Sequence, residues 1–258
     1  MPHDHPGSAP APPRVALVTG GARGIGRGCA LALAERGFDV ALVDVLVPEM
    51  ERTAEEIRAL GRRARPYPAD VADFGRAQEV VDDVVGTWGR VDFLLNNAGR
   101  SMPKGLLEIT EEEWDRTLDI NLKSCFNWCR AVVPTMQARG GGRIVNMSSL
   151  NAYSGGVTSA VSKFAYAAAK AGILGLTRAL AKELGPAIAI NAICPGVIET
   201  EVGNSLTRSR GAELTRGIVL GRLGTPRDVA EVVVFLATSE PSFITGQDFV
   251  VDGFQWVL

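Results

Sequence analysis

The chain has 258 residues, of which 46% are hydrophobic and 22% are charged, and its formal net charge at pH 7 is -2. This length and composition are typical of one α/β domain with a single core rather than of two small domains. The slight negative charge provides no positive field for a polyanion, so we expect no nucleic-acid partner.

Residues 1–13, MPHDHPGSAPAPP, are rich in proline and small residues, and we expect a disordered N-terminal tail. No apolar segment there has the length of a signal peptide, and no run in the chain is long enough to span a bilayer, so we expect a cytoplasmic protein with no membrane partner. Both histidines, His3 and His5, lie in this tail. The four cysteines form no C-x-x-C pair and are expected to be buried thiols, so no metal site is predicted.

Seven short apolar runs alternate with longer segments of helical period along the rest of the chain. The runs cover residues 15–19, 40–44, 64–70, 91–96, 143–148, 188–194 and 248–252. Strands that are apolar throughout and separated by helices indicate a parallel sheet covered on both faces. We therefore predict a single Rossmann-like, doubly wound α/β domain over residues 14–258, with about seven parallel strands. The irregular stretch 199–224 is expected to form a lid.

The first predicted strand runs directly into TGGARGIG, residues 19–26, and then into a helix. Glycines at 20, 24 and 26 permit a tight turn and a close approach of the backbone to a pyrophosphate, while the helix N-terminus provides N–H groups and partial positive charge. The second strand ends at Asp44, near the distance expected for an acid that binds a ribose. The arrangement predicts a dinucleotide-binding site.

Further motifs follow the glycine loop. They are NNAG at 96–99, Asn121, the pair Ser148 and Ser149, Tyr166-x-x-x-Lys170, and PG at 195–196. Together with the spacing TG-x-x-x-G-x-G they resemble the short-chain dehydrogenase/reductase family, in order and over nearly the whole chain. The resemblance implies an oxidoreductase that interconverts a small secondary alcohol and a ketone by hydride transfer with NAD(P).

Tyr166 and Lys170 are four residues apart in KFAYAAAKAG, so on a helix they share one face. A phenol is a poor base at neutral pH, but a nearby ammonium and the positive nicotinamide of an oxidised cofactor both favour phenolate. The resemblance implies that Tyr166 exchanges a proton with the substrate oxygen, that Lys170 also holds the nicotinamide ribose, and that Asn121 supports a proton-relay water. Lys163 is a geometric rival of Lys170 but does not fit the family motif.

The resemblance also implies a serine that hydrogen-bonds the substrate oxygen, and we assign it to Ser149, with Ser148 as the alternative. Either serine can instead cap the end of the preceding strand. Ser149 precedes Tyr166 by 17 residues, a few more than is usual in the family, and the extra length lies within residues 151–165. That insertion contains further hydroxyls at Ser154, Ser159 and Ser162, and we expect it to reshape the substrate pocket.

The remaining cofactor contacts are carried over from the family motifs. Asp70 and Val71 resemble the pair that flanks adenine, although Asp70 also suits a cap for the next helix. The backbone at Val197 or Ile198 and the hydroxyl of Thr200 are expected to contact the nicotinamide amide, although a bare turn also explains PG. The full predicted set is Gly20, Arg23, Gly24, Ile25, Gly26, Asp44, Asp70, Val71, Asn97, Ala98, Gly99, Tyr166, Lys170, Pro195, Gly196, Val197, Ile198 and Thr200.

Two residues give opposite indications about the cofactor. Asp44 can accept both ribose hydroxyls of NAD but would face the 2′-phosphate of NADP, and two unit charges 4 Å apart at an effective dielectric near 20 interact by about 4 kcal/mol. Arg23, just before the second motif glycine, often accompanies NADP in the family, but it also suits an exposed position beside the adenosine. We predict NAD, with NADP as the less favoured cofactor.

The substrate is less well defined by the sequence. Arg100, Asn151 and Tyr153 follow motifs that border the cleft and suit a polar pocket for a sugar, polyol or hydroxy acid, but they also suit ordinary solvated loops. Arginines 208, 210 and 216 in the expected lid suit an acyl carrier protein, a carboxylate or a solvated helix face. The alternatives are an NADPH-linked 3-oxoacyl-thioester reductase and, in another class, a non-catalytic cofactor-binding scaffold.

The chain ends in TGQDFVVDGFQWVL, residues 245–258, which carries Phe254, Trp256, Val257 and Leu258 after the last predicted strand. Large apolar side chains at a terminus need a covering surface. By family resemblance we predict a homotetramer of two-fold symmetry, in which terminal strands and helices within 111–138 and 164–184 pack across subunits. The alternative is that Trp256 folds back onto its own subunit.

Overall fold

The computed structural model describes residues 12–156, 162–201 and 213–255. Its centre is a seven-stranded sheet of order β3-β2-β1-β4-β5-β6-β7, in which every neighbouring pair is parallel. The strands are β1 Val15–Thr19, β2 Asp39–Asp44, β3 Ala64–Pro68, β4 Phe93–Asn96, β5 Gly142–Met147, β6 Ile188–Pro195 and β7 Asp248–Val251. All seven predicted strands are present, and the predicted doubly wound fold is confirmed.

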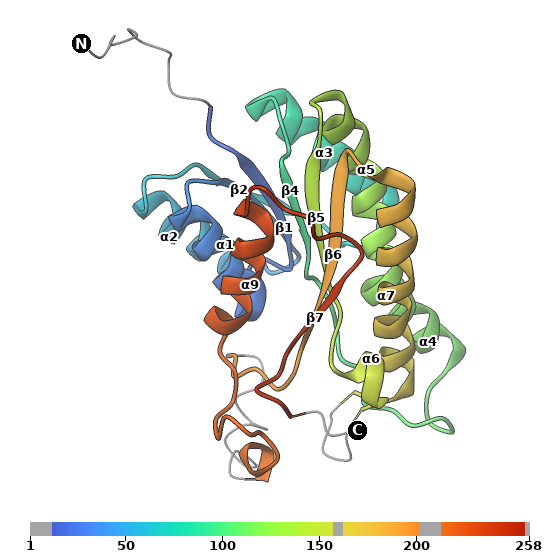
Figure 1. Ribbon diagram of the computed structural model, residues 1–258. Helices are drawn as coiled ribbons and strands as arrows, with labels where there is room; N and C mark the ends of the chain where they lie inside the picture. Colours follow the sequence, from blue (N-terminus) through green and yellow to red (C-terminus); the bar gives the residue numbers. More distant parts are fainter. Residues whose placement is uncertain (1–11, 157–161, 202–212, 256–258) are drawn as a thin grey trace, which may run out of the picture.

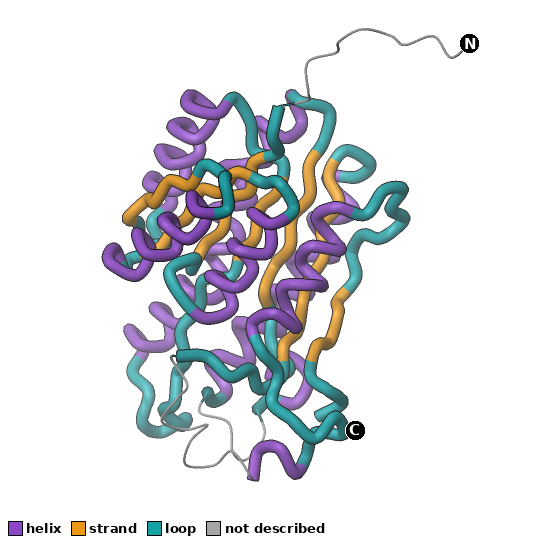
Figure 2. The backbone as a smooth tube through the Cα atoms, turned by 90° about the vertical axis from the view of Figure 1, so that its left-hand side faces the viewer, coloured by secondary structure: helices purple, strands orange, loops and turns teal. Residues whose placement is uncertain are grey.

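Helices cover both faces of the sheet, and Figures 1 and 2 show the strands between the two helical layers. One face carries α1 Gly24–Glu35, α2 Val47–Ala59 and α9 Pro226–Thr238, and the other carries α3 Phe74–Trp88, α5 Ser124–Ala138 and α7 Phe164–Leu184. Each layer closes its own apolar core on the shared sheet. The strand order reverses direction between β1 and β4, which is the point where such sheets open a ligand crevice.

The alternation of side chains along the central strands explains why these runs are apolar throughout. In β1, Val15 and Leu17 pack toward α3 and α5, whereas Ala16 and Val18 pack toward α1 and α9. The edge strand β3 is different, because Arg65 and Pro68 are exposed there. An edge strand lies partly in solvent, and this accounts for the mixed sequence ARPYP.

The predicted helical region 111–138 is divided into three parts. Helix α4, Glu111–Leu118, begins with a capping box made by Thr110 and Glu113. A π-helical turn, η1 Asp119–Lys123, then leads without a break into α5. The short helix α6, Asn151–Ser154, follows β5. Single π-helical turns within α-helices frequently mark functional positions, and this one contains Asn121.

The buried state predicted for the thiols is confirmed, because Cys29, Cys125, Cys129 and Cys194 are all free and buried. Burial raises the pKa of Cys125 to about 11. Residues 1–11, with both histidines, lie outside the described residues. In the described ranges, no helix has the length and apolarity needed to cross a bilayer, and no group of three or more metal-ligating side chains is found together.

Candidate active site

The sequence motifs meet at the carboxyl ends of the central strands. A pocket of about 270 Å³ opens there, with lining residues from the segments that follow β1, β4, β5 and β6 and from the start of α7. Parallel strands bring their carboxyl ends to one edge of the sheet, so loops far apart in sequence share this space. Ten predicted site residues line the pocket: Ile25, Asn97, Gly99, Ser149, Tyr166, Lys170, Pro195, Gly196, Ile198 and Thr200.

The glycine loop is folded tightly between β1 and α1. The N–H groups of Gly20 and Gly21 both donate to the carbonyl of Val43, at 2.8 and 3.3 Å. A Cβ at Gly26 would lie 2.0 Å from the carbonyl oxygen of Gly20, so only glycine allows this close approach. The loop therefore presents the N-terminus of α1 to the cleft, as a pyrophosphate site requires.

The N–H of Gly24, at the start of α1, already has an anionic partner. It donates to Oε2 of Glu201 at 3.1 Å. The positive end of a helix favours a negative group, and here that group comes from the segment after β6. Sequence analysis did not identify Glu201, because only the fold brings it to α1 across 177 residues of sequence.

Asp44 ends β2 beside the glycine loop. Its carboxylate accepts hydrogen bonds from the backbone N–H groups of Ala22, Val45 and Leu46, at 3.1, 2.8 and 3.1 Å. These contacts fix the carboxylate where the adenosine ribose of a dinucleotide is expected. Arg23 precedes α1 and is exposed, and it makes no ion pair with any described residue.

The NNAG motif joins β4 to the glycine loop. Nδ2 of Asn97 donates to the carbonyls of Thr19 and Gly20, both at 3.1 Å, and the N–H of Ala98 donates to Oγ1 of Thr19 at 3.2 Å. The glycine loop is therefore held by the Asn97 side chain and the Ala98 N–H, both from the segment after the neighbouring strand β4. Gly20 and Ala98 themselves lie outside the lining of the pocket.

Buried hydrogen bonds between polar side chains connect strands β4 and β5 to α7, the helix that carries Tyr166 and Lys170. Nδ2 of Asn96 donates to Oδ1 of Asn146 at 2.8 Å, and Nδ2 of Asn146 donates to Oγ1 of Thr177 at 3.0 Å. All three side chains are buried, so these hydrogen bonds are screened from water. They tie β4, β5 and α7 together below the pocket.

Tyr166 and Lys170 both project from α7 into the pocket, as their spacing predicts. Nζ of Lys170 lies 5.5 Å from the centroid of the Tyr166 ring. The lysine is only 2% exposed, and its Nζ donates to the carbonyl of Met147 at 2.8 Å. Lys163 is exposed and precedes the first turn of α7. It does not line the pocket, so geometry favours Lys170 over its rival.

The two neighbouring serines have different environments. Ser148 is buried, and its hydroxyl donates to the carbonyl of Lys170 at 2.8 Å. Ser149 is half-buried, and its hydroxyl oxygen accepts the N–H of Asn151 at 3.2 Å. Ser148 therefore fixes β5 to α7, whereas the proton of Ser149 forms no hydrogen bond with another described residue. This arrangement favours Ser149 as the group that meets a substrate.

Asn121 is fully buried behind the pocket rather than in its lining. Its Oδ1 accepts the N–H of Arg100 at 3.1 Å, and its Nδ2 donates to the carbonyls of Arg100 and Thr117 at 2.9 and 3.0 Å. A Cβ at Gly99 would lie 2.9 Å from this Oδ1 and 3.4 Å from Nζ of Lys170. The absent side chain at Gly99 therefore lets Asn121 and Lys170 approach the same point.

The PGVIET segment follows β6 and forms one wall of the pocket. The N–H of Gly196 donates to the carbonyl of Val251 at 3.0 Å, and the N–H of Val197 donates to Oε1 of Gln255 at 3.1 Å. Thr200 faces the glycine loop, since its methyl carbon would lie 3.5 Å from a Cβ at Gly24. The hydroxyl of Thr200 is thereby brought near the start of α1.

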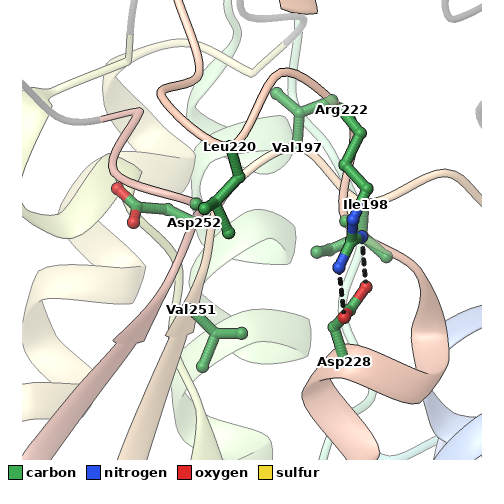
Figure 3. Close-up of a pocket in the computed structure, with 9 residues that line it drawn as sticks. Val197, Ile198, Leu220, Arg222, Asp228, Val251 and Asp252 are labelled. Carbon is green, nitrogen blue, oxygen red and sulfur yellow. Dashed lines mark hydrogen bonds and ion pairs between the residues drawn. The ribbon is translucent and has the colours of Figure 1, made fainter.

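A second, smaller pocket of about 90 Å³ lies behind this wall. Figure 3 shows the ion pair of Arg222 and Asp228 at one side of it and Asp252 at the other. The N–H of Glu199 donates to the carbonyl of Gly224 at 2.8 Å, so the segment before α9 supports the PGVIET wall from outside. Residues 202–212 of the expected lid, with Arg208 and Arg210, lie outside the described residues, and Arg216 is exposed.

Asp70 and Val71 lie in the loop between β3 and α3. Asp70 does not cap α3, because the N-cap is Asp73, whose carboxylate accepts the N–H of Arg76 at 2.9 Å. The cap alternative for Asp70 is therefore wrong. Although burial opposes the change, hydrogen bonds from Ala72 and Arg116 lower the pKa of the Asp70 carboxyl. Val71 is buried, consistent with a position beside an adenine ring.

Of the three polar residues suggested for substrate recognition, only Arg100 lines the pocket. The ring of Tyr153 packs with the cluster of Leu174 and Cys194, and Asn151 contacts Ser149 through its backbone. Sequence analysis did not identify Ser101 or Met147 as lining residues. Ser101 is the second residue after the NNAG motif, which is the signal that was available, whereas Met147 acts through its carbonyl and leaves no signal in its side chain.

Comparison with known proteins agrees with this geometry. A family model described as enoyl-(acyl carrier protein) reductase matches residues 20–253. The chain is 40% identical over 242 residues to the 3-oxoacyl-(acyl-carrier-protein) reductase FabG of Thermotoga maritima, covering 93% of this chain and 96% of that protein. It is 39% identical over 249 residues to the oxidoreductase UcpA of Salmonella typhimurium, covering 93% of each.

Solved structures show the same relationship. A short-chain type dehydrogenase/reductase from Mycobacterium marinum superimposes with a TM-score of 0.87 at 32% identity, over 93% of this chain and 94% of that one. A short-chain dehydrogenase/reductase of the glucose/ribitol dehydrogenase type from Brucella melitensis gives 0.86 at 31% identity, over 95% and 97%. The chain belongs to the short-chain dehydrogenase/reductase family and is an oxidoreductase that uses a nicotinamide cofactor.

Proposed function

We propose that the protein interconverts a small secondary alcohol and a ketone with NAD as cofactor. The observation that carries this proposal is that Tyr166, Lys170 and Ser149 line one pocket, with the buried Lys170 held beside the tyrosine ring by the carbonyl of Met147. A bound nicotinamide supplies the hydride acceptor or donor at its C4. The glycine-cradled start of α1, the Asp44 carboxylate and Thr200 fit such a cofactor.

The proton chemistry belongs to the chain's own side chains. In the oxidative direction the hydroxyl proton of the alcohol passes to the phenolate oxygen of Tyr166 as the C–H hydride leaves. The ammonium of Lys170 stabilises that phenolate, and the hydroxyl of Ser149 donates to the substrate oxygen. Asn121 remains predicted to support a water relay, and its side chain also holds the backbone at Arg100. The products are a ketone, the reduced cofactor and one proton.

NAD preference is a separate part of the proposal. Three backbone N–H groups hold the Asp44 carboxylate beside the glycine loop. A 2′-phosphate placed there would face a like charge, at a cost of about 4 kcal/mol for a 4 Å separation and an effective dielectric near 20. The kcat/KM ratio for the two cofactors should therefore favour NAD, and Asp44→Ser should move it toward NADP. A tenfold NADP preference in the wild type would show that Arg23 dominates.

A screen of secondary alcohols and ketones, followed by the absorbance of reduced nicotinamide, tests the activity itself. We expect turnover of at least one alcohol with NAD, and loss of that turnover in Lys170→Ala. The 40% identical relative named as a 3-oxoacyl-(acyl-carrier-protein) reductase favours a second candidate, the NADPH-linked reduction of 3-oxoacyl thioesters. If no alcohol, ketone or thioester is turned over, the proposed activity is wrong and the non-catalytic cofactor-binding scaffold is the alternative that stands.

We further propose a homotetramer. Aromatic side chains are exposed on both helical layers: Phe235 of α9 is 46% exposed, while Phe74 of α3 and Phe126 of α5 stack at 5.9 Å and are 51% and 47% exposed. Two apolar faces suit the two interfaces of an assembly with crossed two-fold axes. Light scattering should report four subunits, and a stable monomer at micromolar concentration would overturn the assignment. Residues 256–258 lie outside the described residues.

The domain organisation also stays a proposal, with one catalytic domain over residues 14–258 and a lid over about 199–224. Its support is that Glu201, in the first part of the expected lid, contacts the start of α1, and that the N–H of Glu199 bonds to the carbonyl of Gly224, which closes the two ends of the lid on each other. Limited proteolysis with and without NAD checks this. We expect cleavage within 199–224 to slow when the cofactor is bound.

A further inference from the structure

Among the described residues, the charged side chains that line the active-site pocket are all positive. The charged side chains that line it are Arg100 and Lys170, and no carboxylate of the described residues is part of the lining. Hydroxyls from Ser101, Ser149 and Ser162 add hydrogen-bonding groups around the same space. The carboxylate of Glu201 lies outside this lining and accepts the N–H of Gly24 at the start of α1, on the cofactor side. The substrate end is therefore positive.

The two cations of the pocket are not equivalent. Lys170 is buried, and its Nζ is already bonded to the carbonyl of Met147 beside the Tyr166 ring. Arg100 is exposed and lines the same pocket, and its guanidinium has no ion pair within the described part of the chain. Many other arginines here are paired, for example Arg116 with Asp70 at 2.5 Å. Arg100 is therefore the pocket cation whose side chain makes no hydrogen bond or ion pair with another described residue.

The position of Arg100 is set by the catalytic side of the site. The Asn121 side chain accepts the backbone N–H of Arg100 at 3.1 Å and donates to the backbone carbonyl of Arg100 at 2.9 Å. The preceding Gly99 lies against Asn121 and Lys170. This double hydrogen bond fixes the backbone of residue 100, so the long side chain starts from a rigid point at the pocket edge.

We propose that Arg100 binds a carboxylate of the substrate, and that the substrates are short-chain hydroxy acids and the corresponding oxo acids. The inference rests on the proposed alcohol–ketone activity and names its substrate class. A guanidinium binds a carboxylate through two parallel hydrogen bonds, which orients the acid as well as attracting it. The pocket of about 270 Å³ must also admit a nicotinamide ring, which leaves room for only a few carbon atoms. The carboxylate is unchanged while the neighbouring CH–OH becomes C=O, with hydride passing to NAD and a proton to Tyr166.

Paired probes test the proposal. Each of 2-hydroxybutyrate and 3-hydroxybutyrate is compared with its methyl ester, which removes the charge and adds one methyl group, and the readout is the ratio of kcat/KM for acid and ester. Wild type should favour at least one acid more than tenfold over its ester. Because a hydrogen bond to a charged group contributes about 1.5–3 kcal/mol, Arg100→Met should lower that ratio about 10- to 150-fold, mainly through the KM of the acid.

Two further variants separate recognition from folding and from bulk charge. Arg100→Lys keeps the charge but loses the fork geometry, so it should restore part of the acid preference. Arg52→Met removes one charge from an exposed position on α2, outside the pocket lining, and should leave the ratio unchanged. The thermal midpoints of all variants are measured to show that each one folds.

The outcomes separate this inference from the function on which it rests. Turnover of neutral alcohols without an acid preference, or an equal loss for acid and ester in Arg100→Met, overturns the Arg100 assignment and leaves the oxidoreductase proposal standing. Absence of turnover for every acid, ester and neutral alcohol overturns both. A thioester that is reduced efficiently while no free acid reacts also overturns the assignment.

Discussion

The two halves of the cleft are built in opposite ways. The cofactor half, around the start of α1, is shaped by the backbone and by glycines. Gly26 shows this most clearly, because a Cβ there would lie 2.0 Å from the carbonyl oxygen of Gly20. The catalytic half is shaped by polar side chains that are buried and bonded to carbonyls. Lys170 there bonds to Met147, and Ser148 bonds to the backbone of Lys170.

This difference indicates which property, stability and binding or catalysis, a substitution in each half should change. In the cofactor half an added atom has no space, so a change acts on binding and on the fold together. In the catalytic half the ring of Tyr166 can remain while a single oxygen is removed, so a change can act on chemistry alone. The predictions below test that separation, from the largest expected effect to the smallest.

The largest effect is expected from Tyr166→Phe. The ring still packs on α7, but the proton route is lost, and general acid–base catalysis contributes about 10²- to 10⁴-fold, or roughly 3 to 5 kcal/mol of barrier. Turnover should fall by that factor while NADH affinity, followed by its fluorescence, stays within about threefold. Rates within tenfold of wild type would remove Tyr166 from its assigned role.

Gly26→Ala should act on the opposite half. The new methyl meets the Gly20 carbonyl, which is backbone and cannot move aside, so we expect a loss of about 3 kcal/mol in unfolding free energy and a thermal midpoint lower by about 6 to 12 °C. NADH binding should weaken with it. Titration of NADH fluorescence and a thermal melt check both effects.

The matched control for that variant is Gly86→Ala. Gly86 is an exposed residue within α3, and a Cβ there meets nothing within 4 Å. Alanine should stabilise this helix by about 0.5–1 kcal/mol and leave NADH affinity unchanged. If both glycine variants weaken NADH binding equally, the steric explanation for Gly26 is wrong.

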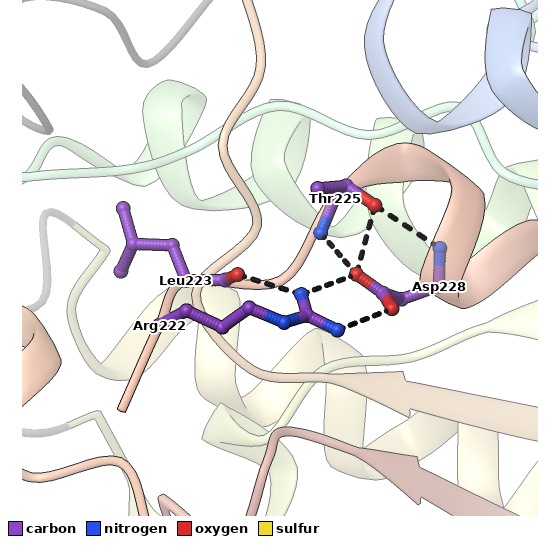
Figure 4. A network of polar contacts seen from close by, with 4 residues as sticks. All are labelled: Arg222, Leu223, Thr225 and Asp228. Carbon is purple, nitrogen blue, oxygen red and sulfur yellow. Dashed lines mark hydrogen bonds and ion pairs between the residues drawn. The ribbon is translucent and has the colours of Figure 1, made fainter. Parts of the chain in front are cut away.

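The smallest effect is expected outside both halves, at the start of α9. Figure 4 shows the Asp228 carboxylate accepting from Arg222 and from the N–H and hydroxyl of Thr225, with Arg222 contacts of 2.8 and 2.7 Å. The Arg222 hydrogen bonds, assisted by Thr225 and opposed by burial, hold the pKa of Asp228 well below its usual range. Asp228→Asn should lower the unfolding free energy by about 1 kcal/mol without changing kcat.

The sign of the pH dependence follows from that lowered pKa. A carboxyl that is more acidic in the folded state contributes its full stabilisation above the unfolded pKa, near 3.9; this contribution begins to fall below about pH 4 and is lost completely only as the pH falls through the lowered pKa of the folded state. The gap in thermal midpoint between wild type and Asp228→Asn should therefore be largest above about pH 5 and should narrow as the pH falls from about 4 to 3. A gap that is constant from pH 6 to pH 3 would show that the charge of Asp228 does not contribute.

Sequence patterns predicted the parallel sheet and the family correctly. The seven strands and their parallel direction follow from apolar runs and helical spacers, and the family follows from motifs in order along the chain, whereas the strand order in the sheet was not predicted. The spacing of Tyr166 and Lys170 predicted a shared face, which the structure confirms. The π-helical turn at Asn121 was not predictable, because the sequence of 111–138 carries no proline or glycine at that point.

The sequence by itself determined which residue types are present at each strand end and how far apart they lie along the chain. Only the tertiary structure decided between neighbours with the same chemistry. Both serines line the pocket, but the tertiary structure bonded the hydroxyl of Ser148 to the Lys170 carbonyl, 22 residues away, and left the hydroxyl proton of Ser149 without a bond to another described residue; it also placed Lys170 in the cleft and Lys163 outside it. It also brought Glu201 to α1 and Arg100 to Asn121. The physical reason is that these choices depend on hydrogen bonds between distant segments, whereas motif spacing reports only local geometry.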